Sequence, residues 1–513
     1  MYRVYAISVY QNHTQIYVIL KMPGKRSLSS EDRKFFILVR KATISNPFSE
    51  ERLELDIKIA NFQRVKERPH DIEDAVESIE TRILNLEEGI TDIIKHYEGK
   101  DRQILETSIQ FLFFYRYRKQ FDRFIKKQIE AGDTPIKLDF INEIFSFLQP
   151  RGFSQEQIQG AIEHSYQFRR AFHFIDQNLI GRSPVMRKLR YDLWNNIFTH
   201  NIEMYRKFLL NRMEDFSTLI LGETGTGKGT VARAIGRSGY IPFDLAKKSF
   251  VESFMRSFVS INLSQFPETL IESELFGHKK GAFTGAIEDY IGVFGRCSLF
   301  GAIFLDEIGE IAQPIQIKLL QVLQERVFYP VGSRQQERFQ GRVIAATNRS
   351  INELRNNNIF RDDFYYRLCS DVIVVPTLQQ RIQEDPAELD DLLEFIINKI
   401  VGTDSRELTY MVRATIRKQL GDKYPWYGNV RELEQCVRRV ILNKKYLGDS
   451  RPEQNTLSSN LNAIADSGEV SANRLLSGYC KLLYDRFGTY EEVARRTQLD
   501  RRTVTKYIKT WEP

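Results

Sequence analysis

Apolar residues over positions 1–60 come in short runs separated by polar turns, a pattern typical of β-strands. The runs are "VYAISVY", "QIYVILKM" and "KFFILVRKATI". From Asp71 onward the spacing changes, and Ile, Val and Leu recur at intervals of three and four residues from Ile72 to Ile93. This seam predicts a helix that either joins two chains in a coiled coil or packs inside its own domain. Gly89 interrupts the seam and weakens the coiled-coil alternative.

Aromatic and basic side chains interleave over residues 111–128, "FLFFYRYRKQFDRFIKKQ". Such a helix either binds an anionic partner through stacking and charge, or lies half-buried with its Lys and Arg heads in water. The composition favours the half-buried helix, because it is common on helices that cover a core. Helical patterning continues to about Asn178. Together with the strands before it, this pattern predicts an α+β domain over residues 1–177.

In the middle of the chain, two apolar runs read as buried strands of a parallel sheet. Thr218–Leu221 and Ala302–Leu305 are continuous apolar runs, each followed at once by polar residues. A later segment, rich in Ser, Asn and Asp and without aromatic residues, reads as a flexible tether before a short basic helical unit. These changes divide the chain into five segments: 1–177, 178–378, 379–447, 448–472 and 473–513.

The composition is that of a globular protein, with 42% hydrophobic and 27% charged residues. No apolar run approaches the roughly 20 residues that a membrane helix needs, and the N-terminus "MYRVYAISVYQNH" lacks a signal peptide's apolar core. We therefore expect a cytosolic protein with no membrane partner. The four cysteines show no metal-ligand spacing, and the net charge of +7 permits nucleic-acid binding without indicating it.

A glycine-rich loop follows the first buried strand in "STLILGETGTGKGT". Strand, loop and helix stand in the order that phosphate binding requires: glycines let backbone amides point at the phosphates, the next helix offers its positive end, and Lys228 reaches the terminal phosphates. We expect a Mg²⁺-bound nucleotide here. The expected nucleotide-binding residues are Gly222, Glu223, Thr224, Gly225, Thr226, Gly227, Lys228, Gly229 and Thr230.

Polar residues at the ends of two later strands complete the expected chemistry. Asp306 and Glu307 end "AIFLDE", where Asp306 can hold Mg²⁺ and Glu307 can polarise the attacking water. Asn348 ends "RVIAATN", where its amide can hydrogen-bond both this water and the terminal phosphate. The three residues together predict hydrolysis of the nucleotide.

Between these motifs stands "GAFTGA", from Gly281 to Ala286. Two glycine-hinged turns flanking Phe283 and Thr284 predict a mobile loop with an apolar and a hydroxyl tip. With its flanks "ESELFGHKK" and "GAIFLDEIGE", the hexapeptide closely resembles the signature of the sigma-54-dependent transcriptional activators, the bacterial enhancer-binding branch of the AAA+ ATPases. The resemblance covers about residues 178–513. No known receiver, GAF or PAS domain is recognised in the first 177 residues.

The resemblance implies an α/β AAA+ core with a parallel sheet over 178–378, a helical lid over 379–447 and a regulatory or sensory domain before them. It implies that Arg361 and Arg367 act as arginine fingers on a neighbouring subunit, that Asn262 restrains Glu307, and that Arg431 senses nucleotide from the lid. It also implies that the six residues of the loop contact sigma-54: Gly281, Ala282, Phe283, Thr284, Gly285 and Ala286. Gly229 departs from the motif's usual metal-binding position, so Thr230 or water is expected to join Asp306 on Mg²⁺.

The end of the chain, "TYEEVARRTQLDRRTVTKYIKTW", reads as two short helices about a turn, with Asp500 capping the second helix. It resembles the Fis-type helix-turn-helix of the same activators, with Gln498 where glycine is common. A helix of this kind suits the DNA major groove, and an interaction module without DNA is the alternative. The expected DNA-binding residues are Arg501, Arg502, Thr503, Lys506 and Lys509.

Taken together, the motifs and the resemblance imply a ring-forming ATPase, a hexamer by family resemblance, that binds upstream double-stranded DNA. It would use ATP hydrolysis to remodel the closed complex of sigma-54 RNA polymerase holoenzyme into an open one. Two alternatives stay open: an AAA+ remodeller of another nucleoprotein complex, and a nucleotide-sensing DNA-binding repressor that does not hydrolyse ATP.

Overall fold

The computed structural model describes residues 10–11, 14–15, 26–62, 72–448 and 471–511. The chain forms two compact units. The first comprises residues 1–415 with 423–444, and the second comprises residues 416–422 with 445–513. Within the described residues, no helix has both the length and the apolar character needed to cross a membrane.

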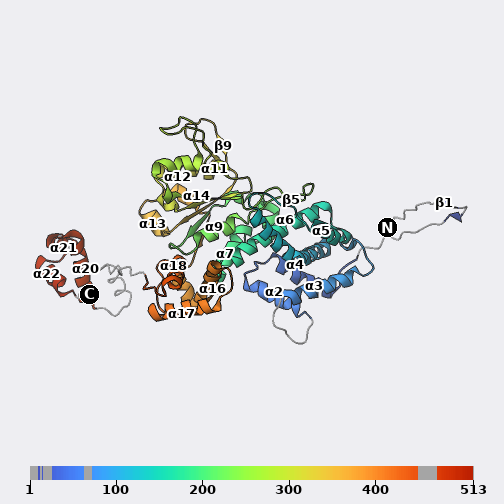
Figure 1. The fold of residues 1–513 in the computed structure, drawn as a ribbon, viewed down its shortest axis with the longest axis horizontal. Coiled ribbons are helices and arrows are strands. Elements are labelled where there is room, and N and C mark those ends of the chain that lie inside the picture. The colour runs from blue at the N-terminus through green and yellow to red at the C-terminus, as the bar shows by residue number, and fades with distance from the viewer. Residues whose placement is uncertain (1–9, 12–13, 16–25, 63–71, 449–470, 512–513) are drawn as a thin grey trace. The chain divides into compact units, whose positions relative to one another are not determined.

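Helices dominate the N-terminal segment of the first unit (Figure 1). Before them in the sequence, two strands of two residues each, β1 (Tyr10–Gln11) and β2 (Thr14–Gln15), pair with each other. The helices are α1 (Ser30–Ile44), α2 (Glu50–Ala60), α3 (Ile72–Glu87), α4 (Gly99–Ala131), α5 (Ile141–Leu148) and α6 (Gln155–Phe172), with short turns η1 (Ile93–His96), η2 (Gln149–Arg151) and η3 (His173–Gln177).

The prediction of a strand in "KFFILVRKATI" is wrong, because this run lies in α1. Ser29 caps the helix by accepting a hydrogen bond from the Asp32 backbone N–H. The buried residues Phe35, Phe36, Val39 and Ala42 recur at steps of three and four residues, which places them on one helical face. A run of β-prone side chains therefore forms a helix, since its cap and its spacing outweigh local strand propensity. The other two predicted strands lie almost wholly outside the described residues.

Both ambiguous helical patterns resolve as core helices. Helix α3 ends at Glu87, before the last positions of the predicted seam, and buries Ala75, Ile79 and Ile83 against its own domain. Helix α4 buries most of the aromatic residues of the interleaved segment, while Arg116 pairs with Glu80 at 2.7 Å near the surface. The half-buried reading of residues 111–128 is therefore confirmed for this chain.

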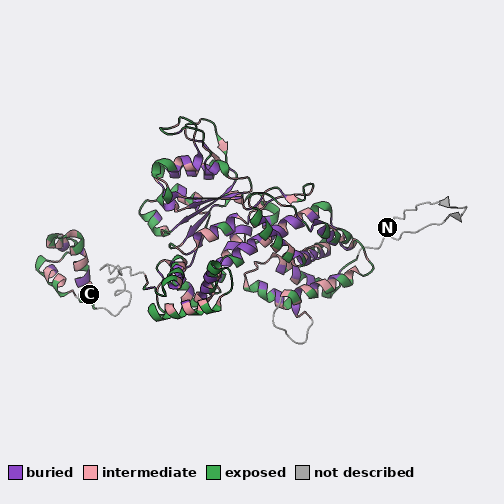
Figure 2. Cartoon of the chain, viewed as in Figure 1, coloured by how far each residue is buried: buried purple, intermediate pink, exposed green. Residues whose placement is uncertain are grey.

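A parallel sheet of five strands, in the order β11-β3-β10-β7-β6, forms the centre of residues 178–447, which are called the ATPase segment below after the expected activity. The strands are β3 (Thr218–Leu221), β6 (Phe258–Asn262), β7 (Ala302–Asp306), β10 (Arg342–Thr347) and β11 (Asp371–Val374). The predicted α/β class is confirmed here. Helices cover both faces, as Figure 2 shows by the buried strands between them.

Alternate residues of each strand enter two different cores, as the period of two requires. Phe304 faces the core that contains α9 (Lys228–Gly236) and α7 (Pro184–Phe198), whereas Ile303 and Leu305 face the core of α12 (Gln313–Glu325) and α14 (Asp362–Leu368). The first of these cores continues without a break into α1, α4 and α6. The N-terminal segment and one face of the ATPase sheet therefore share a single hydrophobic core.

The remaining elements of the ATPase segment are short, apart from the lid helices. The lid helices are α15 (Leu378–Glu384), α16 (Glu388–Val401), α17 (Arg406–Gln419) and α18 (Asn429–Asn443). The short elements are α8 (Ile202–Met204), η4 (Tyr205–Leu209), η5 (Met213–Asp215), β4 (Phe243–Asp244), β5 (Ser249–Phe250), η6 (Leu263–Gln265), α10 (Glu268–Phe276), α11 (Val293–Arg296), η7 (Ile308–Glu310), β8 (Val327–Phe328), β9 (Glu337–Arg338) and α13 (Ile351–Asn356).

Three helices form the C-terminal end of the second unit: α20 (Ala472–Phe487), α21 (Tyr490–Thr497) and α22 (Arg501–Thr510). They bury a small core of Cys480, Leu483, Val493 and Val504. Gln498 takes a left-handed conformation, with φ of 56°, in the turn between α21 and α22. Most of the predicted tether, residues 448–472, lies outside the described residues.

Candidate functional site

The carboxyl ends of four neighbouring strands meet at one edge of the sheet. In the strand register, Asp306 of β7 lies beside Asn262 of β6 and Ala346 of β10. On the other side, Thr347 of β10 lies beside Leu221 of β3, which leads into the glycine-rich loop. Ligands of parallel sheets bind at this edge. The fold thus brings Asn262, Asp306 and the loop together, although about 84 residues of sequence separate the most distant of them.

The loop from Gly222 to Lys228 has the conformation of a phosphate cradle. Gly225 and Gly227 have φ of 84° and 107°, a region that favours glycine. A Cβ on Gly225 would lie 2.1 Å from the Gly428 carbonyl oxygen, so the loop has no room for another residue there. The Lys228 ammonium donates to the Gly222 carbonyl at 2.8 Å, which holds it over the loop. The backbone N–H groups at the start of α9 complete an anion site.

The charged groups of the site are only partly compensated. Burial raises the pKa of Asp306 and Glu307 above their ordinary values, and burial lowers the pKa of Lys228. Each shift means that the folded site disfavours the charged form of its own side chains. A triphosphate with its cation carries charges of both signs and would stabilise the charged forms of these side chains. Such pKa shifts are therefore typical of a site that binds charged groups.

Asn348 and Asn262 lie on opposite sides of the carboxylates. The Asn348 amide lies 3.5 Å from the Thr224 hydroxyl, so it faces the loop. Asn262 lines the same pocket, but its side-chain oxygen accepts from the Ser264 N–H at 3.0 Å and the Ser264 hydroxyl at 2.8 Å. In this conformation Asn262 stabilises the turn after β6.

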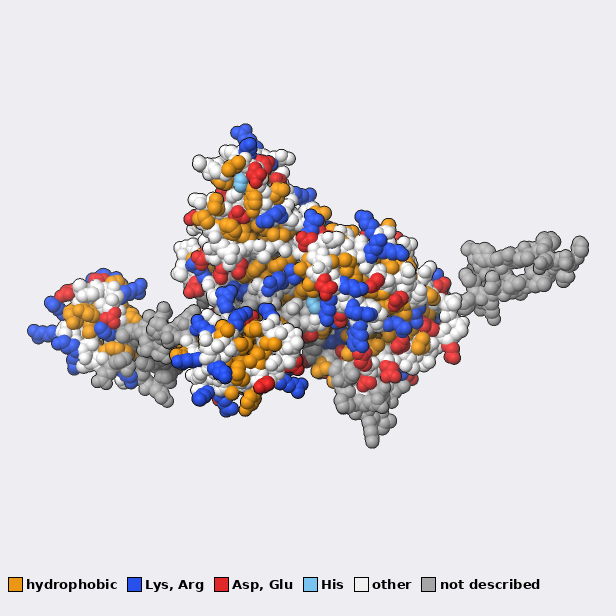
Figure 3. Space-filling view, viewed as in Figure 1, with side chains coloured by type: hydrophobic (Ala, Val, Ile, Leu, Met, Phe, Trp, Pro, Cys, Tyr) orange, Lys and Arg blue, Asp and Glu red, His pale blue; other side chains and the backbone are white. Residues whose placement is uncertain are grey.

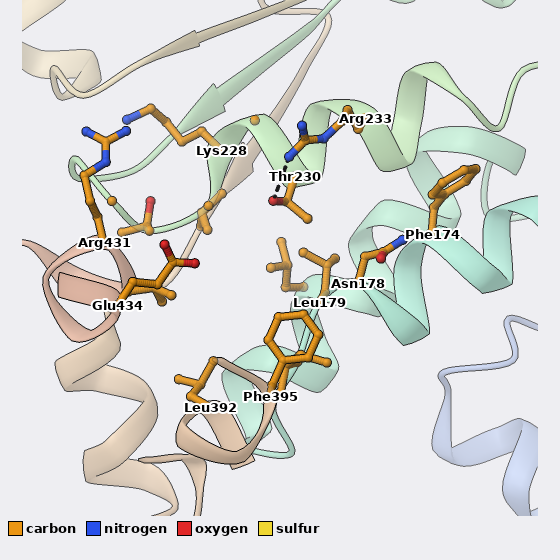
Figure 4. A pocket seen from close by; sticks show the side chains of 18 of the residues that line it. Phe174, Asn178, Leu179, Lys228, Thr230, Arg233, Leu392, Phe395, Arg431 and Glu434 are labelled. Carbon is orange, nitrogen blue, oxygen red and sulfur yellow. Dashed lines mark hydrogen bonds between the residues drawn. The ribbon is translucent and has the colours of Figure 1, made fainter. Parts of the chain in front are cut away.

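A pocket of about 910 Å³ extends from the loop along α9 (Figure 4). Lys228 and Arg431 lie at one end, with Glu434 beside Arg431 on the lid helix α18. Leu179, Leu392 and Phe395 line the middle of the pocket, where the ring of a nucleobase can pack against apolar side chains. Phe174 and Asn178 lie at the far end. The pocket therefore has a polar, cationic end for phosphates and an apolar stretch for a nucleoside.

Gly229 and Thr230, in the first turn of α9, occupy the positions from which a side chain could bind Mg²⁺. A Cβ on Gly229 would find only the Phe304 ring, at 3.9 Å, so the backbone there leaves room for a side chain that this sequence does not carry. The Thr230 hydroxyl lines the pocket and lies 3.4 Å from an Arg233 nitrogen. Asp306, Thr230 and phosphate oxygens are hard oxygen ligands of the kind that Mg²⁺ takes, so the residues present fit this cation.

Arg361 and Arg367 are not among the described residues that line their own chain's pocket. Arg361 is exposed and pairs with Asp363 at 2.8 Å, and Arg367 donates to the Leu323 carbonyl at 3.0 Å. Both lie at the ends of the short helix α14. Both arginines therefore lie away from the nucleotide pocket of their own chain.

Sequence reasoning missed two sets of contacts at the pocket. Asn429, fully buried at the start of α18, donates to Glu223 at 3.1 Å and to the Thr224 carbonyl at 3.2 Å, and accepts from the Leu378 N–H at 2.8 Å. It joins the lid to the phosphate loop. Arg381 and Glu388 form a buried pair at 2.7 Å beside the base region. The only sequence signal for Asn429 was its position in "YGNVREL", two residues before Arg431.

The hexapeptide loop is held at its base and exposed at its tip. The Gly281 N–H donates to the Ala286 carbonyl at 2.8 Å and closes the loop. Gly281 and Gly285 have φ of 79° and 103°, as the two predicted hinges require. At the tip, Phe283 is 37% exposed and Thr284 is also exposed. Ile287, directly after the loop, is 80% exposed, which is high for such an apolar side chain.

The C-terminal helices present a basic face. Arg501, Arg502, Lys506 and Lys509 are all exposed on α22, and Figure 3 shows Lys and Arg side chains projecting from the surface of this unit. Thr503 differs from the other four, because its hydroxyl donates to the capping carboxylate of Asp500 at 2.5 Å. Thr503 therefore stabilises the start of the helix in this conformation.

Comparisons with known proteins agree with this geometry. Residues 196–374 match the family model of the sigma-54 interaction domain. The Nif-specific regulatory protein of Azotobacter vinelandii is 40% identical over 266 residues, which cover 51% of this chain and 47% of that protein. The transcriptional regulator NtrC of Azospirillum brasilense is 37% identical over 262 residues, with the same two coverages. The hydrogenase regulatory protein HoxA of Cupriavidus necator is 38% identical over 227 residues, covering 44% of this chain and 43% of its own length. This chain thus spans about half the length of the curated relatives it matches.

Proposed function

We propose that the sigma-54 interaction domain at residues 196–374, an AAA+ ATPase module, makes this chain an ATP-driven transcriptional activator. It would bind DNA upstream of a promoter and remodel the closed complex of sigma-54 RNA polymerase into an open one. The observation that carries the proposal is an exposed, glycine-hinged loop on the same folded body as a nucleotide pocket. Since RNA polymerase and DNA are its proposed partners, we place the protein in the bacterial cytoplasm.

In the hydrolysis step, each polar residue of the pocket has a distinct role. Lys228 and the loop amides bind the β- and γ-phosphates of ATP, and Arg431 approaches them from the lid. Asp306 and Thr230 would hold Mg²⁺, which neutralises phosphate charge when it is bound. Glu307 orients the attacking water and withdraws its proton, while Asn348 fixes the water against the γ-phosphate. The raised pKa of Glu307 makes it a better proton acceptor than an exposed glutamate.

Arg361 and Arg367 complete the site in trans. Since they lie away from their own chain's pocket, we propose that they reach the γ-phosphate bound to a neighbouring subunit. A monomer then hydrolyses ATP poorly, and activity requires a ring. The resemblance to the activator family supports a hexamer.

The loop is linked to the pocket by a short stretch of chain. Strand β6 ends at Asn262 beside Asp306. The turn η6 follows, and then α10, which ends at Gly277, where the loop's stem begins. The Ser273 hydroxyl of α10 contacts the His278 ring at 2.6 Å, and that ring packs on Phe283 with centroids 4.9 Å apart. We propose that loss of the γ-phosphate moves α10 and, with it, the tip that grips sigma-54.

DNA binding is assigned to α22. Its exposed cations would contact phosphates, and Arg501 or Arg502 would reach base edges in the major groove. Thr503 is better suited to holding the helix start, given its bond to Asp500. Helices of this kind usually act in pairs, so a dyad-symmetric site is expected.

The test is ATP-dependent open-complex formation at a sigma-54 promoter by the full-length protein, with Thr284→Ala alongside. We expect wild type to open the promoter, and Thr284→Ala to hydrolyse ATP at the wild-type rate without opening it. Thr403→Ala, an exposed threonine outside the loop, is the matched control and should open the promoter normally. If wild type forms rings and hydrolyses ATP but opens no sigma-54 promoter, the activator assignment is wrong and another remodelling target takes its place.

A further inference from the structure

One face of helix α6 carries a row of polar side chains that enter the ATPase segment. Gln159, Glu163, Gln167 and Arg170 follow one another at intervals of four, four and three residues, so they share a helical face. Glu163 is 7% exposed, and Gln167 and Arg170 are 0% exposed. Polar groups are seldom buried this deeply without hydrogen-bond partners. The partners of these four side chains therefore show which part of the chain this face of α6 holds in place.

Each of these side chains bonds the stretch of backbone directly after α9. Gln159 donates to the Phe243 carbonyl at 2.9 Å, and Glu163 accepts from the Phe243 N–H at 2.9 Å and the Tyr240 hydroxyl at 2.7 Å. Farther along α6, Gln167 donates to the Ser238 carbonyl at 3.0 Å. The stretch therefore runs antiparallel to α6 and is held along its length.

Arg170 makes the contact nearest to α9. Its two terminal nitrogens donate to the carbonyls of Arg237, the C-cap of α9, at 2.9 Å and of Gly239 at 2.7 Å. Burial lowers the pKa of Arg170 to about 10, so the side chain is still charged at neutral pH. The negative end of the α9 dipole and the Tyr166 and Phe254 rings, 4.5 and 5.5 Å away, stabilise the buried cation.

The other end of α9 is the phosphate site. This helix of nine residues, about 13 Å long, begins at Lys228 and ends against Arg170. Beyond Arg170, the chain continues through η3, where His173 and Phe174 line the nucleotide pocket, Phe174 at its far end. The N-terminal segment thus meets the nucleotide site at two places, the end of α9 and the end of the pocket.

We propose that α6 is a positioning element of the nucleotide site, with Arg170 as the residue through which the N-terminal segment sets the position of α9. A signal that displaces α6 then changes nucleotide affinity, and bound nucleotide stabilises the docked position of α6, because such coupling is reciprocal. This defines how the N-terminal segment regulates the ATPase. The inference rests on nucleotide binding alone, so it stands or falls independently of the sigma-54 and DNA assignments.

The first test measures the affinity of the full-length protein for a fluorescent ADP analogue. Arg170→Met removes both carbonyl contacts and should weaken binding roughly tenfold, within the usual range of coupling between sites. The matched control is Arg169→Met. Arg169, the preceding residue of α6, pairs with Asp122 at 2.6 Å inside the N-terminal segment and does not contact α9 in the described structure. The control should lower the thermal midpoint of unfolding but change affinity less than twofold.

Equal weakening by the two variants, or unchanged affinity in a folded Arg170→Met, would overturn the proposal. A second measurement needs no substitution. In wild type, ADP should slow amide hydrogen exchange over residues 237–243, where the Phe243 N–H bonds Glu163, as well as in the phosphate loop. Slowed exchange in the loop alone, with residues 237–243 unchanged, also overturns the proposal.

Discussion

At the scale of single residues, the most informative side chain is Glu307. Its pKa is raised mainly by burial, so the ionised form that activates water is lost at a higher pH than for an ordinary glutamate. We expect kcat/KM for ATP to fall as the pH is lowered through this raised pKa, with the acid limb above pH 4.5, the ordinary value. A limb at or below 4.5 would show that Glu307 is not the proton acceptor.

Substitution separates the hydrolysis role of Glu307 from nucleotide binding. Glu307→Gln should lower the ATPase rate by at least about 100-fold, the usual contribution of a positioned general base, with ADP affinity nearly unchanged. Glu310→Gln is the matched control, since Glu310 belongs to the same segment but is exposed and pairs with Arg349 at 2.7 Å. A protein that still regulated its promoter as Glu307→Gln would be a nucleotide-sensing repressor.

A substitution at Gly229 is expected to strengthen Mg²⁺ binding rather than weaken it. Gly229→Ser should raise Mg²⁺ affinity in the presence of ATP several-fold, because a serine hydroxyl there can join Asp306 on the cation. Its Cβ meets only the Phe304 ring at 3.9 Å, so the fold accepts it. The measurement is the Mg²⁺ dependence of ATP hydrolysis. Unchanged dependence would mean that Thr230 or water already fills the position.

At the scale of elements, the exposed loop depends on a neighbour that its own sequence does not include. Gly332 has φ of 78°, and a Cβ there would lie 2.7 Å from the Ala282 Cβ. Gly332→Ala should therefore displace the loop base and reduce promoter opening several-fold while ATP hydrolysis continues. Gly402→Ala is the control, since it has a φ of 81° with nothing within 4 Å. It shares the backbone strain of about 1–2 kcal/mol without the collision, and equal effects would contradict the prediction.

If the basic face of α22 binds DNA, the affinity should depend on salt concentration in a way that each exposed cation affects. Lys506→Ala should weaken DNA binding at all sequences and reduce the slope of log affinity against log salt by about 1, because one phosphate contact is lost. Lys423→Ala, a change of an exposed lysine outside α20–α22, should leave the slope unchanged. Titrations of full-length protein at several salt concentrations measure this. No change in slope for Lys506→Ala would place the DNA contact elsewhere.

At the scale of the whole molecule, the N-terminal and ATPase segments behave as one folding unit. Aromatic residues of α6 pack into the ATPase segment, as in the stacked pair of Tyr166 and Phe250 with centroids 4.0 Å apart. Deleting residues 1–177 would expose this core and leave the carbonyls of Arg237 and Gly239 without their partner. We expect the truncated protein to aggregate on size-exclusion chromatography. Deleting 471–513, which lies in the second unit, should leave a soluble ATPase, and a soluble, active 178–513 fragment would contradict the prediction.

Much of the ATPase fold could be predicted because its signals are local. Buried parallel strands are continuous apolar runs, so β3 and β7 were found within a residue of their observed bounds. The run at residues 34–44 was wrongly predicted for the opposite reason: its composition favours a strand, whereas the Ser29 cap and packing against α4 favour a helix. The spacing of apolar residues was compatible with both the half-buried position of α4 and the packing of α3 inside its own domain.

The sequence by itself determined the chemistry of the pocket, because the glycines, Lys228 and the adjacent carboxylates occupy fixed positions in short contiguous motifs. Only the tertiary structure decided how the rest of the chain meets that pocket. Asn429 reaches the phosphate loop across 205 residues, and Arg170 reaches the end of α9 across 67. Both side chains bond backbone carbonyls, which every residue possesses. No residue type marks such an acceptor, so folding alone reveals the contact.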